Sequence, residues 1–425
     1  MTTRPTPHVL VSGAGIAGTA LALQLIRSGI RTTVIERAAA PRPGGQAVDL
    51  RGPSREAAER MGLMPGITRH QLQEEGLIYV DAHGRGYGRM AMEDFDGQGA
   101  VAEIEITRGD LVEVIAEALA EASALAVDEA GEPLLDLRYD DAIASLTQDA
   151  DGVDIRFTSG RSRRFDLVVG ADGVHSATRR LAFGPEERYA TPLGGYGAFF
   201  TMPSPADLEP DWFSMRLVPG AMLGIRPDAD PATSKAILTV RGPHDPSLRR
   251  DRAAQQEVVR QAIQGAGWHA DAVLAAMEEA DDFYFDELVR VDVPDLAAGR
   301  VTLVGDAGYS GSPLTGMGTA MALVGAYVLA AELAATPGDP AAAIARYGAA
   351  IAPFLEQAKK IPGGSLSTML PRTKLLSALS KANVKVMLSR PLRPLMKRMF
   401  LAGQGAELDL PATSADAALD RVSAA

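Results

Sequence analysis

The chain of 425 residues contains no cysteine. This absence excludes a disulfide framework, a thiolate metal site and a redox-active dithiol, so any electron transfer requires a bound cofactor. Positive charge is in the minority, because 42 Lys and Arg stand against 54 Asp and Glu and give a formal net charge of −12. An acidic chain lacks the cationic surface from which nucleic-acid binding draws its affinity, so we expect no nucleic-acid partner.

Long uninterrupted apolar runs are also missing, although hydrophobic residues make up 46% of the chain. A membrane-spanning helix needs about 20 apolar residues in succession, so we expect no stable membrane insertion. The first apolar strand, 8–12, begins so early that it leaves no room for a cleavable signal peptide. These features predict a cytoplasmic protein, and the length predicts two interleaved domains. The choice between a monomer and a homodimer is left open by the sequence.

The predicted elements change character along the chain. Residues 8–36 contain an apolar strand, a glycine turn, a helix and a second strand, which together form one βαβ unit. Between about 188 and 290, aromatic and β-branched strands alternate with Pro, Asp and Gly turns, a pattern typical of an antiparallel sheet. Further strands are expected at 142–146, 153–158, 166–170 and 301–304, and helices at 111–125, 317–334 and beyond Pro340.

The first strand leads into the motif Gly13-x-Gly15-x-x-Gly18. In such a motif the first glycine allows a tight turn, the second lets the backbone approach a pyrophosphate, and the third lets the helix pack closely on the strand. The free N–H groups at the helix start attract phosphates. Glu36 ends the second strand, where a carboxylate can accept the hydroxyl groups of an adenosine ribose. The motif predicts a dinucleotide site without choosing between NAD and FAD.

Two later segments make that choice. Gly170-Ala171-Asp172-Gly173 is followed by Ser176 and Arg179, and Gly305-Asp306 is followed by Pro313-Leu314-Thr315-Gly316-Met317-Gly318. In this order and at this separation, the three motifs resemble those of the FAD-dependent aromatic hydroxylases typified by para-hydroxybenzoate hydroxylase, the class A flavoprotein monooxygenases. The resemblance covers about residues 8–350.

The resemblance implies roles for single residues. Asp172 would serve the FAD region and the groove where NAD(P)H docks, and Asp306 would hydrogen-bond the ribityl chain of the flavin. Arg108 matches an arginine that reaches FAD from a helix start. The run Gly44–Leu50 is similar to that of tetracycline-inactivating monooxygenases, which makes Asp49 a flavin contact. A turn cap at Asp172 and a surface ion pair at Arg108 remain open as alternatives.

The helix that follows Gly316 would lie beneath the flavin ring, where its N–H groups stabilise the anionic reduced flavin without any acid or base side chain. We therefore assign no catalytic side chain, and we expect Pro313, Gly316, Met317 and Gly318 near the ring. Arg42, in a turn-rich loop, is a further candidate for the flavin or an NADPH phosphate, although loop arginines are more often solvated. The expected contacts of non-covalently bound FAD are Gly13, Gly15, Ile16, Ala17, Gly18, Glu36, Arg37, Asp49, Arg108, Asp172, Gly305, Asp306, Pro313, Gly316 and Gly318.

The third motif departs from the commonest pattern of the family. That pattern has His after Gly-Asp-Ala-Ala, then Pro-Pro-x-x-Gly-Gln-Gly and an Asn. This chain instead carries Gly308-Tyr309, Ser312-Pro313, Met317 and Ala320. The backbone geometry can survive these changes, but the substrate class is left open.

The resemblance predicts an α/β fold with a Rossmann-like FAD-binding domain, an inserted antiparallel β-sheet substrate domain and C-terminal helices. The FAD-binding domain would comprise 1–80, 98–187 and 288–358, and the substrate domain 81–97 and 188–287. Residues 359–425 would form C-terminal bridging helices.

The implied activity is that of a single-component monooxygenase. NADPH or NADH would bind transiently and reduce FAD, the reduced FAD would capture O₂ as a flavin hydroperoxide, and one oxygen atom would pass to a hydrophobic aromatic or polyketide-like small molecule. The expected substrate contacts, in the strands of the inserted sheet, are Phe199, Phe213, Arg216 and Met222.

Two other functions remain open on the same fold. A flavin oxidase or dehydrogenase would take hydride from its substrate without NAD(P)H, and a binding protein would hold a hydrophobic compound without turnover. No hydrolase or metal constellation competes, because the six histidines show no ligand spacing and no Gly-x-Ser-x-Gly elbow is present. His175 is interpreted as a turn residue and not as a base.

The stretch 359–404 contains no Asp or Glu. Its cations include Arg372, Lys374, Lys381, Lys385, Arg390, Arg393, Lys397 and Arg398. A basic amphipathic segment can lie on an anionic membrane surface, but a helix that bridges an acidic body has the same pattern. The negative net charge favours the intramolecular bridge.

Overall fold

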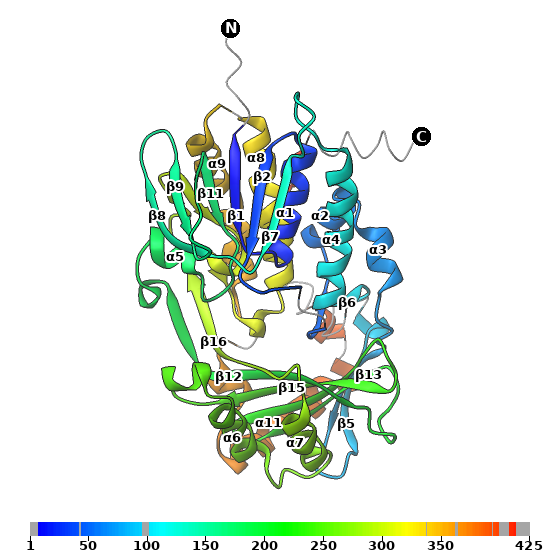
Figure 1. Cartoon of the computed structure of the whole chain (residues 1–425). Helices are drawn as coiled ribbons and strands as arrows, with labels where there is room; N and C mark the ends of the chain where they lie inside the picture. Colours follow the sequence, from blue (N-terminus) through cyan, green and yellow to red (C-terminus); the bar gives the residue numbers. More distant parts are fainter. Residues whose placement is uncertain are drawn as a thin grey trace.

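The computed structural model describes residues 7–41, 44–95, 102–336, 338–361, 364–392, 394–398 and 408–413. Figure 1 shows a parallel sheet with its helices in the upper half of the molecule and a broad second sheet in the lower half. The chain passes between the two halves several times. This arrangement confirms the predicted α/β fold with an inserted sheet and C-terminal helices.

The upper sheet has six strands in the order β17-β18-β11-β1-β2-β7. These strands are β17 (Ala297–Ala298), β18 (Val301–Leu303), β11 (Leu167–Gly170), β1 (His8–Ser12), β2 (Arg31–Glu36) and β7 (Leu135–Tyr139). All neighbours are parallel except β17 and β18. Val9, Leu10 and Val11 of the central strand are fully buried, as expected for a parallel strand covered on both faces. The carboxyl ends of β1, β11 and β18 therefore meet at one edge.

Three helices cover this sheet, namely α1 (Ile16–Arg27), α4 (Arg108–Leu125) and α8 (Gly318–Ala335), with α1 packed between the other two. Helix α1 starts at Ile16, directly after the glycine turn. Helix α4 begins at the N-cap Thr107, whose side chain accepts a hydrogen bond from the N–H of Asp110. This cap fixes the position of Arg108 at the start of the helix.

Helix α8 is the most apolar helix of the fold. Its 18 residues are long and apolar enough to cross a membrane by length and composition, which the sequence prediction had not anticipated. However, 78% of that window is buried inside the molecule, as in the core helix of a folded domain. Its neighbours are α1, α2 (Pro53–Arg60) and α9 (Pro340–Ala358).

The lower sheet has eight strands in the order β19-β16-β12-β15-β14-β13-β4-β5. The strands are β19 (Tyr309–Ser310), β16 (Tyr284–Asp292), β12 (Ala190–Pro203), β15 (Thr233–Arg241), β14 (Ala221–Pro227), β13 (Trp212–Val218), β4 (Gly76–Val80) and β5 (Gly86–Ala91). All pairs are antiparallel except β4 with β13. Residues 76–80 thus lie in the lower sheet, although the sequence placed them at the end of the first FAD-binding segment.

One face of the lower sheet is covered by α6 (Arg252–Ile263) and α7 (Ala270–Glu279). Side chains of a strand alternate between the two faces. Phe200, Leu223 and Leu238 point into the core beneath α6 and α7. Their neighbours along the strands therefore point the other way, toward the six-stranded sheet (Figure 1).

The remaining elements complete the fold. Two short sheets consist of β8 (Ile143–Gln148), β9 (Val153–Phe157) and β10 (Ser162–Phe165), and of β3 (Ala47–Asp49) with β6 (Glu105–Thr107). Further helices are α3 (Met64–Arg69), α5 (Ala177–Ala182), α10 (Leu366–Met369) and α11 (Lys374–Met387). Single turns of 3₁₀ helix are η1 (Glu93–Phe95), η2 (Glu186–Arg188), η3 (Pro246–Arg250), η4 (Gly305–Ala307), η5 (Pro313–Thr315) and η6 (Arg390–Leu392).

Candidate functional site

The three sequence motifs come together at the carboxyl ends of β1, β11 and β18. A Cβ atom on Gly13 would lie 2.4 Å from the carbonyl oxygen of Ala171, so the first motif touches the second. A Cβ atom on Gly305 would lie 3.0 Å from the Cβ of Ala17, so the third motif touches the start of α1. Segments separated by up to three hundred residues therefore build one edge of one sheet.

The glycine turn before α1 depends on its missing side chains. Gly13 has a φ of 111°, a conformation that L side chains rarely adopt, and a Cβ on Gly18 would lie 1.9 Å from the carbonyl oxygen of Gly13. Helix α1 then begins without a side-chain cap and without an acidic residue in its first turn. Its first N–H groups are free to bind an anion such as a pyrophosphate.

Glu36 lies at the end of β2, beside the glycine turn. Its carboxylate accepts hydrogen bonds from the N–H groups of Ala14 at 3.0 Å and Ala38 at 2.9 Å. The carboxylate therefore holds the turn in place and lies at the position expected for a ribose contact, while the neighbouring Arg37 is exposed. Its contact with FAD remains a prediction.

Asp172 braces the turn that follows β11. One carboxylate oxygen accepts from the hydroxyl of Ser176 at 2.5 Å, and the other accepts from the N–H and the hydroxyl of Thr178 at 2.9 and 3.0 Å. The structure thus gives Asp172 the turn-capping role that the sequence analysis left open. A contact with FAD or NAD(P)H remains a prediction for this residue.

Arg179 joins the second motif to the third. Its side chain is fully buried, with Nη1 donating to the carbonyl of Ala307 at 2.8 Å and Nη2 to the carbonyl of Val174 at 2.7 Å. Burial lowers the pKa of this guanidinium. The spacing of Ser176 and Arg179 after Asp172, which carried the family resemblance, is therefore explained by the architecture of the motif itself.

Asp306, Arg108 and Tyr284 lie close together where the two halves of the molecule face each other. Burial raises the pKa of Asp306, and the Ser310 hydroxyl and the Arg108 guanidinium oppose this shift. Burial and then Asp286 raise the pKa of the Tyr284 hydroxyl. Arg108 opposes this rise, and Asp306 adds to it. Yet Asp306 is exposed and Tyr284 is 46% exposed. The two side chains are thus surrounded by protein but remain accessible to solvent.

Arg108 also lies beside the glycine turn. A Cβ on Gly15 would be 3.7 Å from Nη2 of Arg108, and the Arg108 side chain is exposed. No ion pair of Arg108 is found among the described residues, so the structure does not support the surface ion pair considered as an alternative. Arg42 lies outside the described residues.

Asp49 belongs to a buried group of charges between the two halves. Its carboxylate pairs with Arg51 at 2.6 Å, and in the β3–β6 ladder it lies opposite Glu105. Arg226 from β14 donates to Glu105 and, at 2.8 Å, to Glu74. Burial raises the pKa of Glu74 to about 8 against the opposing effect of Arg226. Sequence reasoning singled out only Asp49 of this group, because the other members are charged residues without a common motif.

The third motif ends in a loop whose backbone is exposed. Pro313, Gly316 and Gly318 are exposed, and Met317 is half-buried. Gly316 adopts a left-handed conformation with a φ of 67° at the end of η5. Helix α8 then starts at Gly318 without a side-chain cap and without an acidic residue in its first turn. The loop therefore offers free N–H groups where the flavin ring is expected.

The departure from the family pattern at Tyr309 has a structural explanation. The Tyr309 side chain is buried, and its hydroxyl is hydrogen-bonded to that of Tyr347 at 2.6 Å. Tyr347 also donates to the carbonyl of Leu303 at 3.2 Å. A Cβ on Gly325 of α8 would lie only 2.0 Å from the Tyr309 hydroxyl oxygen. The tyrosine thus fits because a glycine on α8 leaves room for it.

The lower sheet has an apolar and aromatic face opposite α6 and α7. Phe199 and Tyr284 are opposite each other in the β12–β16 pair, and their ring centroids are 6.2 Å apart. Met222 packs against the buried cluster of Leu288, Leu366 and Leu370, as does Leu314 of η5. The ring centroid of Phe213 lies 5.4 Å from Cζ of the Arg226 guanidinium. Three of the four predicted substrate residues therefore share the face toward the flavin motifs.

Arg216 lies on the opposite face. It alternates with Met215 and Leu217 along β13, and its Nε donates to the carbonyl of Ala266 at 2.8 Å, between α6 and α7. The structure does not support the predicted substrate contact of Arg216. The alternation of a strand shows which residues share a face but not which face borders the site.

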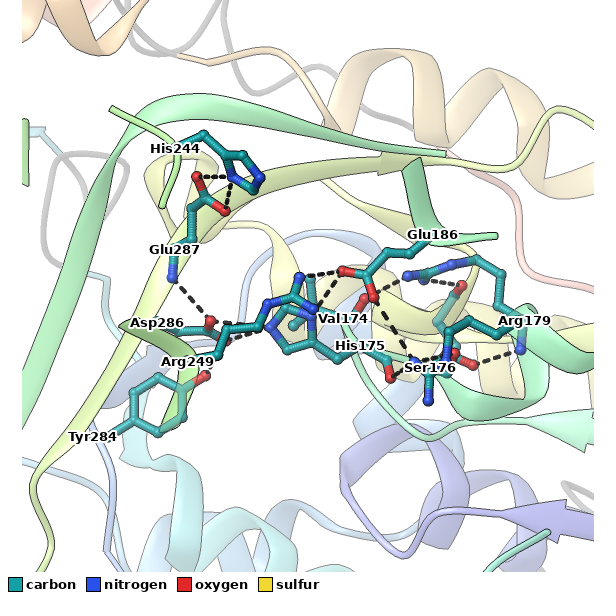
Figure 2. Close-up of polar contacts among 12 residues, drawn as sticks. Val174, His175, Ser176, Arg179, Glu186, His244, Arg249, Tyr284, Asp286 and Glu287 are labelled. Carbon is teal, nitrogen blue, oxygen red and sulfur yellow. Dashed lines mark hydrogen bonds and ion pairs between the residues drawn. The ribbon is translucent and has the colours of Figure 1, made fainter. Parts of the chain in front are cut away.

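His175 connects the second motif to the lower sheet, as Figure 2 shows. Its Nδ1 lies 3.0 Å from Glu186, and its Nε2 lies 3.0 Å from Asp286, which also accepts from the Tyr284 hydroxyl at 2.9 Å. Hydrogen bonds to Asp286 and Glu186 raise the pKa of His175 to about 9. His175 is therefore more than the predicted turn residue, because as a cation it joins carboxylates from both halves of the molecule.

A cavity of about 860 Å³ lies elsewhere, at the outer edge of the lower sheet. Residues of β4 and β5, Trp268 and the end of α11 line it. None of the predicted FAD contacts borders this cavity, so we do not assign it to the cofactor.

These residues fit FAD. Two uncapped helix starts, at α1 and α8, provide backbone donors for the phosphates and for the anionic reduced ring. Between them, the accessible side chains of Arg108 and Asp306 offer a cation and an acceptor of hydrogen bonds. The glycine turn admits no side chain that would obstruct the backbone.

Comparisons with known proteins agree with this geometry. The family described as "FAD binding domain" matches residues 6–359. A flavin-dependent monooxygenase of Legionella longbeachae serogroup 1 (strain NSW150) is 35% identical over 357 residues, which cover 83% of this chain and 87% of the relative. The FAD-dependent monooxygenase asL6 of Sarocladium schorii is 35% identical over 381 residues, which cover 84% and 87% of the two chains.

Among solved structures, the tetracycline destructase Tet(55) superposes with a TM-score of 0.76 and 32% identity, over 96% of this chain and 100% of its own. Because the family match spans more than half of the chain, and because the relatives match over most of both lengths, the protein belongs to the FAD binding domain family and is an FAD-dependent monooxygenase of the class A hydroxylase type.

Proposed function

We propose that the protein is a single-component monooxygenase that uses NADPH or NADH and dioxygen to hydroxylate a hydrophobic, fused-ring aromatic molecule of the polyketide type. One observation carries the proposal. Tyr284 on the lower sheet is 46% exposed, lies within electrostatic reach of Arg108 and Asp306 of the cofactor motifs, and has the ring of Phe199 at 6.2 Å. A flat aromatic molecule can stack on such a face while its edge approaches the cofactor.

The residues of the chain have binding and orienting roles in this proposal. When bound, FAD supplies the redox chemistry, taking a hydride from the nicotinamide and activating dioxygen for transfer of one oxygen atom. The start of α1 and Arg108 hold the phosphates, Asp306 accepts hydrogen bonds from the polar chain of the cofactor, and the start of α8 stabilises negative charge on the ring. The apolar sheet face excludes water from the reacting centre.

Tyr284 contributes an oriented side chain. Its hydroxyl proton is held by Asp286, which His175 and the N–H of Glu287 also bind. With its hydroxyl fixed in this way, the ring keeps a defined position beside Phe199. We propose no proton transfer through Tyr284, since burial and Asp286 raise the pKa of its hydroxyl.

The substrate class is supported by the solved relatives. Two tetracycline destructases, Tet(55) and Tet(51), are 32% and 31% identical to this chain and cover at least 95% of it. Tetracycline is a fused-ring polyketide, and the sheet face with Phe199, Phe213 and Met222 has the apolar character that such a ring system requires. Only one dinucleotide motif is present in the sequence, so the nicotinamide nucleotide binds transiently.

The test is an anaerobic titration of the purified yellow protein with NADPH and then NADH, with and without tetracycline, followed by air and mass spectrometry. The proposal expects bleaching by the nucleotide, faster bleaching with tetracycline, and a product heavier by one oxygen atom. Bleaching by the organic substrate alone would establish an oxidase instead. Binding of tetracycline without any product over many turnovers would establish a binding protein.

A pair of variants tests the assignment of the sheet faces. Phe199→Ala removes a ring from the face toward the cofactor motifs, and we expect a KM for tetracycline about 10-fold higher, in line with the 0.5–1.5 kcal/mol of an aromatic pair plus lost apolar contact. Arg216→Gln on the opposite face serves as the control and should leave KM unchanged. Equal effects of the two substitutions would contradict the assignment.

A further inference from the structure

Helix α11 exposes its apolar side to solvent. None of its fourteen residues is buried. Leu375 is 72% exposed, Leu379 57% and Val386 56%, and Leu376 on the edge of the same side is 51% exposed. A surface helix normally turns such residues toward the core. Among the residues that the structure describes, none covers the apolar outward side of α11.

The exposed residues form one stripe. Leu375, Leu379, Ala382 and Val386 are spaced by four, three and four residues, which places them on one side of an α-helix. The opposite side is the one that packs on the lower sheet, because Val384 and Leu388 lie 3.2 Å from the position of a Cβ on Gly88 of β5. The orientation of α11 is thus fixed by packing, and the stripe must face outward.

Cations flank the stripe without acidic partners. Lys374 and Lys385 are eleven residues apart, just over three full turns, so both lie on one side of α11, between the stripe and the side that packs on the sheet, and both are exposed. Neither forms an ion pair with an acidic side chain within the described part of the chain. Lys381, on the inner side, lies 4.5 Å from the ring centroid of Tyr87 and not beside a carboxylate. The predicted ionic bridge to an acidic body is therefore not formed by these lysines of α11.

We propose that α11 docks the protein on the surface of an anionic phospholipid membrane. Leu375, Leu379 and Val386 would enter the boundary between headgroups and acyl chains, and Lys374 and Lys385 would extend along it to the lipid phosphates. The stretch 359–404 contains no carboxylate that would repel the lipid. In Figure 1, α11 lies at the lower sheet, behind α6 and α7.

A second copy of the chain satisfies the same surface less well. A symmetric contact through α11 would place the lysines of one copy near those of the other, because both partners present the same patch. Like charges in a desolvated contact oppose association. An anionic lipid surface accommodates the apolar stripe and its flanking cations together.

Cosedimentation with vesicles tests the proposal on the full-length, FAD-loaded protein. We expect binding at low salt to vesicles of phosphatidylcholine mixed with phosphatidylglycerol, weak binding to phosphatidylcholine alone, and release as salt rises. Each basic residue near an anionic surface contributes about fivefold to partitioning, so Lys374→Gln with Lys385→Gln should lower the partition coefficient about 25-fold. The triple variant Leu375→Ser, Leu379→Ser and Val386→Ser should abolish binding.

Matched controls separate docking from general surface chemistry. Leu125, Val127 and Leu181 are also exposed, and their triple replacement by Ser should leave binding unchanged. The exposed Arg156 and Arg161, replaced together by Gln, provide the charge control. The FAD content of each variant verifies its fold.

Two results would overturn the proposal. The first is that the wild-type protein does not bind anionic vesicles, or that the stripe variants bind them as well as the wild type does. The second is that the wild-type protein does not bind vesicles and sediments as a dimer, whereas the triple stripe variant sediments as a monomer. That result would assign the stripe to a contact with a second copy. Neither result depends on whether tetracycline is oxygenated, so the proposed function is tested separately.

Discussion

Gly325 and Tyr309 should be strongly coupled in stability. A Cβ on Gly325 would lie 2.0 Å from the Tyr309 hydroxyl oxygen and 3.2 Å from its Cζ, so Gly325→Ala forces the hydroxyl away from Tyr347. Overpacking of this kind costs about 1–3 kcal/mol and the lost hydrogen bond about 1 kcal/mol, whereas alanine in a helix interior recovers about 1 kcal/mol over glycine. We therefore expect a net destabilisation of about 1–3 kcal/mol.

Tyr309→Phe removes the atom that clashes. The nearest remaining Tyr309 atom would then be Cζ at 3.2 Å, a contact that a small shift relieves. In this background, Gly325→Ala should be neutral or stabilising by up to about 1 kcal/mol. The coupling free energy of the double-mutant cycle should therefore be about 2 kcal/mol, within the range found for residues in contact.

Urea unfolding of the four proteins, followed by circular dichroism at one fixed excess of FAD, measures the cycle. A fixed FAD concentration is needed because a ligand of the folded state adds to its stability. If Gly325→Ala is as stable as the wild type, or if Tyr309→Phe does not relieve its cost, the packing explanation for the departure from the family pattern is wrong.

Three further predictions concern charges at the site. Arg108→Ala should weaken FAD binding about 10- to 150-fold, because it removes a charge-assisted hydrogen bond worth about 1.5–3 kcal/mol. An unchanged dissociation constant in flavin-fluorescence titrations would contradict the role of Arg108. Since the folded state raises the pKa of His175 from 6.5 to about 9, the free energy of unfolding should fall as the pH rises through this window. His175→Gln should remove this decrease, on the order of 1–2 kcal/mol after solvent screening, and parallel pH curves for the two proteins would show that the link is absent. Likewise the folded state raises the pKa of Glu74 from 4.5 to about 8. The Glu74→Gln variant should therefore become more stable relative to the wild type as the pH rises through that range. If denaturant titrations give the same difference in the free energy of unfolding at every pH, Glu74 is not protonated in the folded state.

The parts of the fold that the sequence predicted are those with local signals. Apolar periodicity and the positions of the glycines predict the strand β1, the turn at Gly13 and the helix α8. The predicted boundaries of these elements lie within a few residues of the observed ones. The strand β4 was assigned to the wrong half, because its partner β13 lies far away in sequence and an apolar run carries no information about its neighbour.

The same limit applies to the site. The motifs placed Gly13, Gly305 and Arg108 together because each is a short pattern tied to one backbone geometry. Tyr284 and Arg226 were missed because their importance arises only where the two halves of the molecule meet. Their sequence surroundings resemble those of ordinary strand residues.

The parallel pairing of β4 with β13 also has a consequence for biosynthesis. The two strands are separated by about 130 residues, from Val80 to Trp212, so at about 5–20 residues per second the ribosome needs roughly 7 to 26 seconds before β4 can find its partner. During that interval the hairpin of β4 and β5 has an unpaired edge, which is prone to aggregation. Strand β18, at 301–303, emerges later still. Chaperones that shield nascent strands at the ribosome should therefore affect the yield of this protein more than its final stability.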